Sequence, residues 1–155
     1  MLRLLIAGIP GMGKTDMGNY LQEHHGFKHV DMEVGGNIQS ILTTPDIFVN
    51  QLLQEEKIVL TWGFRPFEDA ESVLDLKSKG FKIIWYDGDR ESARREFTRR
   101  SPGESNERAY QYQLMRIETS KIVEQIDPIQ INTFTEEGIF RGYDDIAEEI
   151  LDKMS

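Results

Sequence analysis

Short runs of consecutive apolar residues alternate along this chain with longer stretches in which apolar residues recur every three or four positions. The runs have the length and the branched or aromatic side chains that buried strands prefer. They are residues 2–7, 27–32, 57–62, 81–86 and 128–131. The longer stretches have the period of amphipathic helices, which is clearest near the C-terminus at Ile146, Ala147, Ile150, Leu151 and Met154.

Residues typical of helix ends bound several of the longer stretches. Gly26 follows a helix expected at about 13–25, and Thr44 with Pro45 forms an N-cap and first-turn pair. Pro66 is expected to open a helix that ends at Gly80. The side chains expected to face inward from that helix are Phe67, Ala70, Val73 and Leu74. Two further helices are expected at about 89–100 and 105–126, separated by "SPGES".

The regular alternation of strands and helices predicts an α/β fold with a parallel sheet and helices on both faces. The 155 residues fit a single domain, with no repeat and no linker. In such sheets ligands bind beyond the carboxyl ends of the strands. The residues that directly follow each strand are therefore the candidates for chemistry.

Composition narrows the class of protein. The chain has no cysteine, which excludes disulfides and thiolate chemistry and disfavours a structural zinc site. The formal net charge of −9 disfavours binding to nucleic acid, whose phosphates would be repelled. No apolar run has the length of a signal sequence or a membrane span, so we expect a soluble, cytoplasmic protein. The oligomeric state is left open.

The stretch "GIPGMGKT", residues 8–15, follows directly on the first strand. Gly8, Gly13, Lys14 and Thr15 match the pattern G-x-x-x-x-G-K-[ST]. In this pattern a glycine-rich loop turns backbone N–H groups toward phosphate oxygens, the lysine reaches the β- and γ-phosphates, and the hydroxyl coordinates Mg²⁺. The alternative is a glycine-rich turn with an exposed lysine. The strand before it and the helix after it favour a site for ATP and Mg²⁺.

The rest of the cradle would come from the residues inside and just after the pattern. These candidate nucleotide-binding residues are Pro10, Gly11, Met12 and Asp16. Asp16 has a second interpretation, because an acid in the first turn of a helix also stabilises the helix dipole.

Three further stretches follow the later strands, namely "HVDME", "VLTWGFRP" and "DRESARREFTRR…YQYQLMRIE". With the phosphate loop they make the chain resemble the small P-loop kinases of the adenylate-kinase-like group, and within it the shikimate and gluconate kinases. The resemblance spans nearly the whole chain. It implies a three-layer P-loop fold with five parallel strands in the order 2-3-1-4-5 and a small lid. Gln113 and Glu118 keep a spacing found in gluconate kinases.

The resemblance implies roles for residues that follow the second and third strands. Asp31 would lie near Mg²⁺ with Thr15, and Glu33 would contact the acceptor, although these kinases usually carry aspartate there. Gly63 matches a glycine of their substrate loop, but the run of three glycines found in shikimate kinases is absent. Arg65 would meet an anionic substrate. Either Asp31 or Glu33 can take the proton of an acceptor hydroxyl.

The resemblance also assigns roles to arginines that flank "SPGES". Arg99 and Arg100 would stabilise charge on the transferred phosphoryl group, and Arg95 would contact the nucleotide. Arg108 is similar to a substrate-binding arginine of shikimate kinases. Residues of about 99–107 would form a mobile lid. The alternative for the arginines of this helix is a solvated face paired with neighbouring glutamates.

Two residues at strand ends have alternative interpretations. Asp87 closes the fourth strand, where it is either a Walker-B-like carboxylate or a turn residue at the start of the next helix. Trp62, after the third strand, is either core or part of a substrate pocket. The segment 34–43, which should build much of that pocket, matches no pattern.

The expected function is transfer of the γ-phosphate of ATP to a small-molecule acceptor, either a sugar acid, another polyol or a nucleotide. One alternative is a nucleotide-binding regulatory protein or weak ATPase. A second alternative is a nucleoside or polynucleotide kinase, and the acidic balance of the chain disfavours a polynucleotide.

Overall fold

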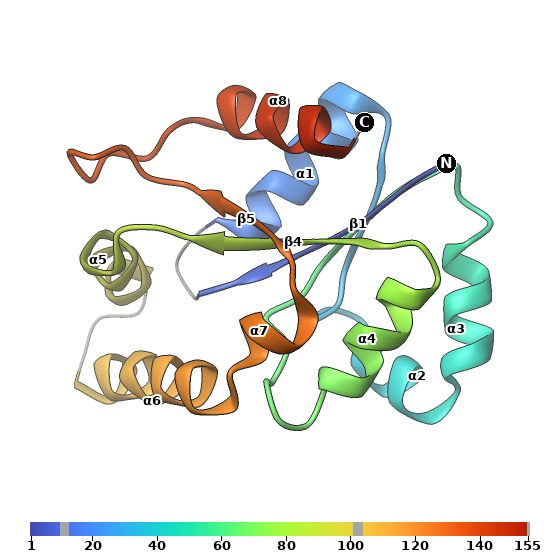
Figure 1. Cartoon of the computed structure of the whole chain (residues 1–155), viewed down its shortest axis with the longest axis horizontal. Coiled ribbons are helices and arrows are strands. Elements are labelled where there is room, and N and C mark those ends of the chain that lie inside the picture. Colours follow the sequence, from blue (N-terminus) through green and yellow to red (C-terminus); the bar gives the residue numbers. More distant parts are fainter. Residues whose placement is uncertain (10–12, 101–103, 155) are drawn as a thin grey trace.

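Five parallel strands form one sheet at the centre of the computed structural model, in the order β2-β3-β1-β4-β5 (Figure 1). The structure describes residues 1–9, 13–100 and 104–154, and only the backbone of residues 100 and 104–106. The strands are β1 (Leu2–Gly8), β2 (Lys28–Asp31), β3 (Lys57–Thr61), β4 (Lys82–Asp87) and β5 (Ile129–Asn132). The predicted fold class and strand order are confirmed.

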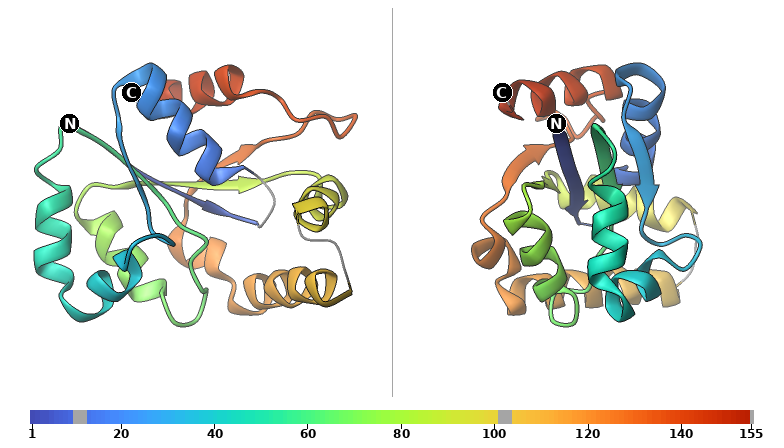
Figure 2. Two further views of the ribbon diagram at one scale, coloured as in Figure 1. Left: turned by 180° about the vertical axis from the view of Figure 1, so that it is seen from behind. Right: turned by 90° about the vertical axis from the view of Figure 1, so that its right-hand side faces the viewer.

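Helices cover both faces of the sheet, which gives three layers (Figures 1 and 2). One face is covered by α1 (Lys14–His25) and α8 (Tyr143–Met154), which contact each other. The other face carries α2 (Asn37–Thr43), α3 (Pro45–Leu52), α4 (Ala70–Ser78) and α7 (Ile122–Ile126). Two more helices, α5 (Arg90–Arg100) and α6 (Glu104–Ser120), lie near the carboxyl end of β4.

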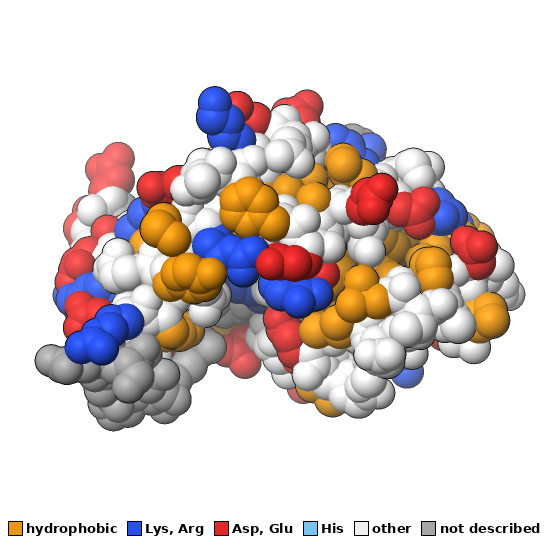
Figure 3. Space-filling model, turned by 90° about the horizontal axis from the view of Figure 1, so that it is seen from below, with side chains coloured by type: hydrophobic (Ala, Val, Ile, Leu, Met, Phe, Trp, Pro, Cys, Tyr) orange, Lys and Arg blue, Asp and Glu red, His pale blue; other side chains and the backbone are white. Residues whose placement is uncertain are grey.

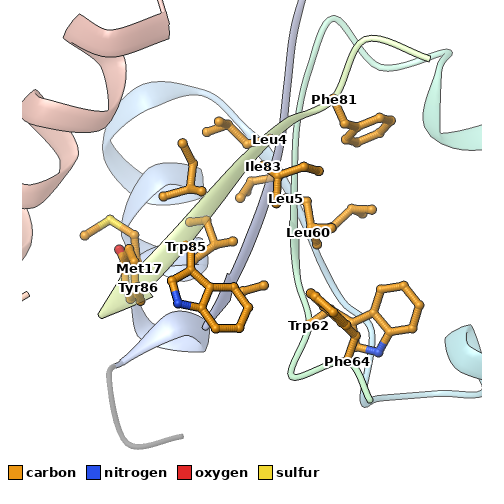
Figure 4. Close-up of a cluster of buried hydrophobic side chains, with 14 of the residues drawn as sticks. Leu4, Leu5, Met17, Leu60, Trp62, Phe64, Phe81, Ile83, Trp85 and Tyr86 are labelled. Atoms are coloured by element: carbon orange, nitrogen blue, oxygen red, sulfur yellow. The ribbon is translucent and has the colours of Figure 1, made fainter. Parts of the chain in front are cut away.

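The central strands are apolar along their length because both faces are covered. Leu4, Leu5 and Ile6 in β1 are fully buried, and β3 and β4 supply their neighbours. Figure 4 shows this cluster, with Trp62, Phe64 and Trp85 at the end opposite Phe81. Large rings thus close the core at the carboxyl ends of the strands. Among the described helices, none is both long and apolar enough to span a membrane.

The helix after β3 begins later than the sequence predicts. It starts at Ala70, not at Pro66, because the buried Asp69 side chain accepts the Arg65 backbone N–H at 2.7 Å and shapes residues 66–69 into a turn. Val73 faces inward as expected. The inward positions expected for Phe67 and Leu74 were wrong, since these side chains are 55% and 40% exposed.

Two other segments differ from the sequence prediction. The helix expected at 105–126 is divided in two, because Lys121 adopts a left-handed conformation with φ of 54°. The break turns Ile122 and Ile126 into the core. The segment 34–43, which matched no pattern, contains the short helix α2. Thr44 and Pro45 do begin α3, but the Thr44 hydroxyl donates to the Ser40 carbonyl of the preceding turn and does not cap α3.

Candidate active site

The phosphate-binding pattern lies between β1 and α1. A Cβ on Gly8, where φ is +135°, would lie 2.3 Å from the Tyr86 backbone oxygen of β4, so only glycine fits. Gly13 precedes α1 in a left-handed conformation with φ of +81°. Pro10, Gly11 and Met12, expected to complete the cradle, lie outside the described residues. The described part therefore has the strand, glycine turn and helix start that a phosphate loop needs.

Lys14 and Thr15 lie at the start of α1. The Lys14 ammonium donates to the backbone oxygens of Gly8 at 3.4 Å and Ile9 at 3.3 Å, which holds it over the loop. The Thr15 hydroxyl donates to Asp31 Oδ2 at 3.4 Å, although these two residues lie on different elements. Hydroxyl and carboxylate oxygens are ligands that Mg²⁺ accepts. The structure thus brings together both residues predicted to bind the metal.

Glu33 is the next polar group along the site. Its Oε1 accepts the Gly63 backbone N–H at 2.6 Å, and its own backbone N–H donates to Asp31 Oδ1 at 3.0 Å. Burial raises the pKa of Glu33, and the nearby Asp31 carboxylate raises it further, while the Gly63 hydrogen bond and the Lys14 ammonium oppose the shift. The carboxylate thus lies between the loop after β3 and the lysine of the phosphate loop.

A cavity of about 760 Å³ opens along these residues. From the phosphate loop and the start of α1 it is lined by Gly8, Gly13, Lys14, Thr15 and Asp16. Four more predicted site residues line it, namely Glu33, Gly63, Arg65 and Arg99. Asp31 makes contact with Thr15 and Glu33 but is not itself among the lining residues. Most predicted residues with described side chains therefore surround one space.

Arg65 reaches the cavity with its guanidinium already bound. Its Nε and Nη2 donate to the two carboxylate oxygens of Asp69 at 3.1 and 3.0 Å, and the Asp69 side chain is only 1% exposed. These hydrogen bonds raise the pKa of Arg65. A forked pair with a buried carboxylate has a fixed geometry. The predicted anion-binding arginine is thus tied to its own loop.

Arg116, from α6, is a cavity residue that the sequence prediction did not assign. Its guanidinium pairs with Glu68 at 2.5 Å and stacks on the rings of Phe67 and Tyr112, at 5.2 and 5.7 Å from their centroids. The hydrogen bond to Arg116 lowers the pKa of Glu68. Figure 3 shows the molecule from below, where basic, acidic and apolar side chains lie close together near the centre of the view.

The arginines of α5 and the predicted lid are only partly described. Arg99 lines the cavity and pairs with Glu96 on its own helix. Arg95 donates to the Ser92 hydroxyl at 3.1 Å and does not line the cavity, and neither does the exposed Arg108. The Arg100 side chain lies outside the described residues, as do residues 101–103 of the predicted lid at 99–107.

The structure places three residues for which the sequence left two interpretations, namely Asp16, Asp87 and Trp62. Asp16 lines the cavity, and its carboxylate also accepts the Tyr143 hydroxyl from α8 at 3.2 Å. Asp87 accepts the backbone N–H of Gly88 at 2.7 Å, which is the geometry of a turn residue. Trp62 is 1% exposed and belongs to the core.

Solved structures of known kinases cover nearly the whole chain, whereas no family model and no curated protein matches its sequence. A gluconokinase from Sinorhizobium meliloti 1021 is 13% identical, with a TM-score of 0.59 over 99% of this chain and 98% of that one. A shikimate kinase from Acinetobacter baumannii in complex with shikimate is 17% identical, with a TM-score of 0.65 over 99% and 93%.

The chain has a shikimate/gluconate-kinase-like fold. A third structure, the YorR protein from Bacillus subtilis in complex with phosphorylated GDP, has a TM-score of 0.66 at 12% identity and covers 97% of this chain and 95% of that one. At these identities the likeness establishes the fold alone, and what this protein does has to be inferred from its own site.

Four aromatic rings that line the cavity were also missed as site residues. They are Phe64, Trp85, Phe97 and Tyr112. Trp85 lines the cavity because it lies near the carboxyl end of β4, and ligands of parallel sheets bind beyond the carboxyl ends of the strands. Tyr112 and Arg116 are four residues apart in α6 and so share one helix face. That spacing was readable in the sequence, but the partner across the cavity was not.

Proposed function

We propose that this protein is an ATP-dependent phosphotransferase that moves the γ-phosphoryl group of ATP to a hydroxyl of a small-molecule acceptor. The observation that carries the proposal is one cavity lined both by Lys14 and Thr15 of the phosphate loop and by Glu33, Gly63 and Arg65 from the segments after β2 and β3. The cavity of about 760 Å³ extends from the phosphate loop to Tyr112 and Arg116 of α6, which leaves room for an acceptor beside the nucleotide.

The residues present fit ATP and Mg²⁺. The turn at Gly8 leaves no room for a Cβ, and a helix of 12 residues begins directly after Gly13, so the N-terminal end of α1 faces the space where phosphates would lie. Lys14 would contact the β- and γ-phosphates, and Thr15 and Asp31 would hold the metal. Mg²⁺ would neutralise charge on the phosphates.

The proposed transfer step takes place between ATP and a hydroxyl group of the acceptor. A bond forms between the acceptor oxygen and the γ-phosphorus, the bond from that phosphorus to the β–γ bridging oxygen breaks, and ADP leaves with the electron pair. The acceptor hydroxyl proton goes to a carboxylate or to solvent. Glu33 lies beside Lys14 and would orient the hydroxyl toward the phosphates.

The arginines near α5 would complete the site. Arg99 lines the cavity and would stabilise charge on the transferred group, with Arg100 and Arg95 as further candidates from the same helix. Residues of about 99–107 would act as a lid within the single domain and keep water from the phosphates.

The test is ADP release by the purified full chain with ATP and Mg²⁺, measured with and without a panel of acceptors. We expect release that depends on an acceptor and is abolished in Lys14→Ala, whereas Lys82→Ala, an exposed lysine outside the cavity lining, stays at the wild-type rate. Release that is equally fast without any acceptor would identify an ATPase. Turnover by Lys14→Ala within about twofold of wild type would contradict the phosphate-loop assignment.

A further inference from the structure

The charges at the acceptor end of the cavity compensate one another. Apart from Lys14 and Arg99, the cationic residues among the described lining residues are Arg65 and Arg116. Each has its own carboxylate, Asp69 for Arg65 and Glu68 for Arg116. Glu33 adds a third carboxylate, so this end carries no surplus of positive charge for an anionic acceptor.

The pair between Arg65 and Asp69 also resists being opened. Asp69 is almost fully buried and accepts three hydrogen bonds, all from the backbone and guanidinium of Arg65. Withdrawing the guanidinium toward a substrate would leave a buried carboxylate without its counter-ion, which is strongly unfavourable. Arg65 is therefore built into the wall and is not available to bind a substrate carboxylate or phosphate.

Arg116 is held in a comparable way from α6. Two rings, Phe67 and Tyr112, contact its guanidinium, and Glu68 pairs with it across 48 positions of the chain. The charge of this guanidinium is compensated by Glu68, so the group offers a ligand a flat surface and not an unpaired positive charge. The rim of the acceptor end is thus flat and close to neutral.

The walls between these pairs are aromatic. Phe64 and Trp85 meet edge to face with ring centroids 6.1 Å apart, which fixes both rings, and Phe97 and Tyr112 line the same cavity. Rings cannot hydrogen-bond the several hydroxyls of an open-chain polyol, whereas a flat ring gains contact area and stacking against them. Besides the charged residues, Gln113 supplies a polar side chain at this end.

We propose that the acceptor is an uncharged alcohol carried on a flat ring, the chemical class that includes the nucleosides. This inference rests on the proposed phosphotransferase function and names the acceptor class of that same site. The flat ring stacks on the exposed Tyr112, above the floor formed by the buried Phe64 and Trp85, and Glu33 orients the hydroxyl that receives the phosphoryl group.

The first experiment compares acceptors of matched structure. ADP release by the full chain with ATP and Mg²⁺ is measured with pyrimidine and purine nucleosides, their 5′-monophosphates, sugar acids and open-chain polyols at equal concentration. We expect a nucleoside to stimulate release at least about tenfold more than its monophosphate or any sugar acid. A sugar acid, polyol or monophosphate as the best acceptor would overturn the inference and leave the phosphotransferase function standing. Stimulation by no compound would contradict that function and this inference together.

A second experiment tests the ring wall. Tyr112→Ala should raise the KM for the best flat-ring acceptor roughly tenfold while the KM for ATP stays within about twofold, because the aromatic contact lies at the acceptor end. Tyr112→Phe keeps the ring and should retain the wild-type value. Met115→Ala is the matched control, since Met115 is equally exposed on α6 but does not line the cavity. An unchanged acceptor KM in Tyr112→Ala would refute the stacking role.

A substitution at Glu68 tests whether paired charges exclude an anionic acceptor. Glu68→Gln removes the partner of Arg116 at an exposed position, where the change is tolerated by the fold. The released guanidinium should improve kcat/KM for the 5′-monophosphate relative to the nucleoside by about tenfold. A preference that does not move toward the anion would show that Glu68 does not set the charge of the acceptor.

Discussion

Replacing Gly63 by alanine tests the position of Glu33 without touching its carboxyl group. A Cβ at this position would lie 2.9 Å from Glu33 Oε1 and 4.0 Å from Lys14 Cε, with no backbone atom among its near neighbours. The carboxylate is the end of a flexible side chain, so it can move aside. Gly63→Ala should therefore leave the fold intact and push the Glu33 carboxylate away from the Gly63 N–H that it now accepts at 2.6 Å.

The magnitude follows from the hydrogen bond that is lost. A hydrogen bond to a charged group contributes about 1.5–3 kcal/mol, which corresponds to about a 10- to 150-fold change in kcat/KM if all of it is used in the transition state. We expect a loss of this size for the acceptor, with the KM for ATP within about twofold of wild type. The assay is acceptor-dependent ADP release together with thermal unfolding of both proteins.

A double-mutant cycle decides whether the effect passes through Glu33. In a Glu33→Ala background the carboxylate is gone, so adding Gly63→Ala should change kcat/KM by less than about twofold. Full additivity of the two substitutions would show that Gly63 acts independently of Glu33. A Gly63→Ala protein with wild-type kinetics would refute the assignment of Glu33 to the acceptor.

Two further predictions concern arginines of α5 and the arginine that shortly precedes α8. Replacing Arg99 and Arg100 together by alanine should lower acceptor-dependent turnover by at least about 10²-fold with an unchanged melting temperature, and a smaller loss would remove these arginines from the catalytic group. Arg141→Gln should lower the melting temperature at neutral pH, because it removes ion pairs with Asp145 and Glu149, and the loss should shrink as the pH falls below about 4. A loss of melting temperature that does not depend on pH would contradict the contribution of these ion pairs.

The sign of the second effect follows from two carboxylates on α8. Hydrogen bonds from Arg141 lower the pKa of Asp145 in the folded protein. Burial raises the pKa of Glu149, but its contacts with Lys153 and Arg141 outweigh this and lower it. A lowered folded pKa gives stability that is present above the unfolded pKa and is lost as the pH falls through the folded value. Arg141 also donates to the Asn132 backbone oxygen, so part of the loss should remain in acid.

The strands and the parallel sheet could be predicted from local patterns, whereas the strand order was implied by the resemblance to the small P-loop kinases. Each strand is a short apolar run, and the phosphate-loop residues are contiguous from Gly8 to Thr15. The resemblance implied that Asp31 lies near Thr15, and the two side chains are hydrogen-bonded because parallel strands bring their carboxyl ends to one edge of the sheet.

The helix ends and the acceptor end depend on contacts that no local pattern encodes. Phe67 has the spacing of an inward residue but lies exposed, because the buried Asp69 forms a turn in place of the first helical turn. Arg116 sits on an ordinary helix and becomes a site residue only through Glu68, 48 positions away. Lys121 breaks a continuous helical pattern with a left-handed conformation that lysine rarely adopts.

Residues 63–69 hold several side chains around the cavity, and under the proposed function they are the segment through which one P-loop fold could take a different acceptor. The Gly63 N–H holds Glu33 next to the phosphate loop, Asp69 fixes Arg65 in the wall, and Glu68 binds Arg116 of α6. In the proposed reaction the phosphate loop would contact only groups that every ATP molecule carries. Selection of the acceptor would therefore fall to residues 63–69 and the side chains that they hold. Arg65 and Arg116 are each paired with a carboxylate from residues 63–69, namely Asp69 and Glu68. Exchanging one of these acidic residues would therefore change the charge of the cavity while the sheet and the phosphate loop stay as they are.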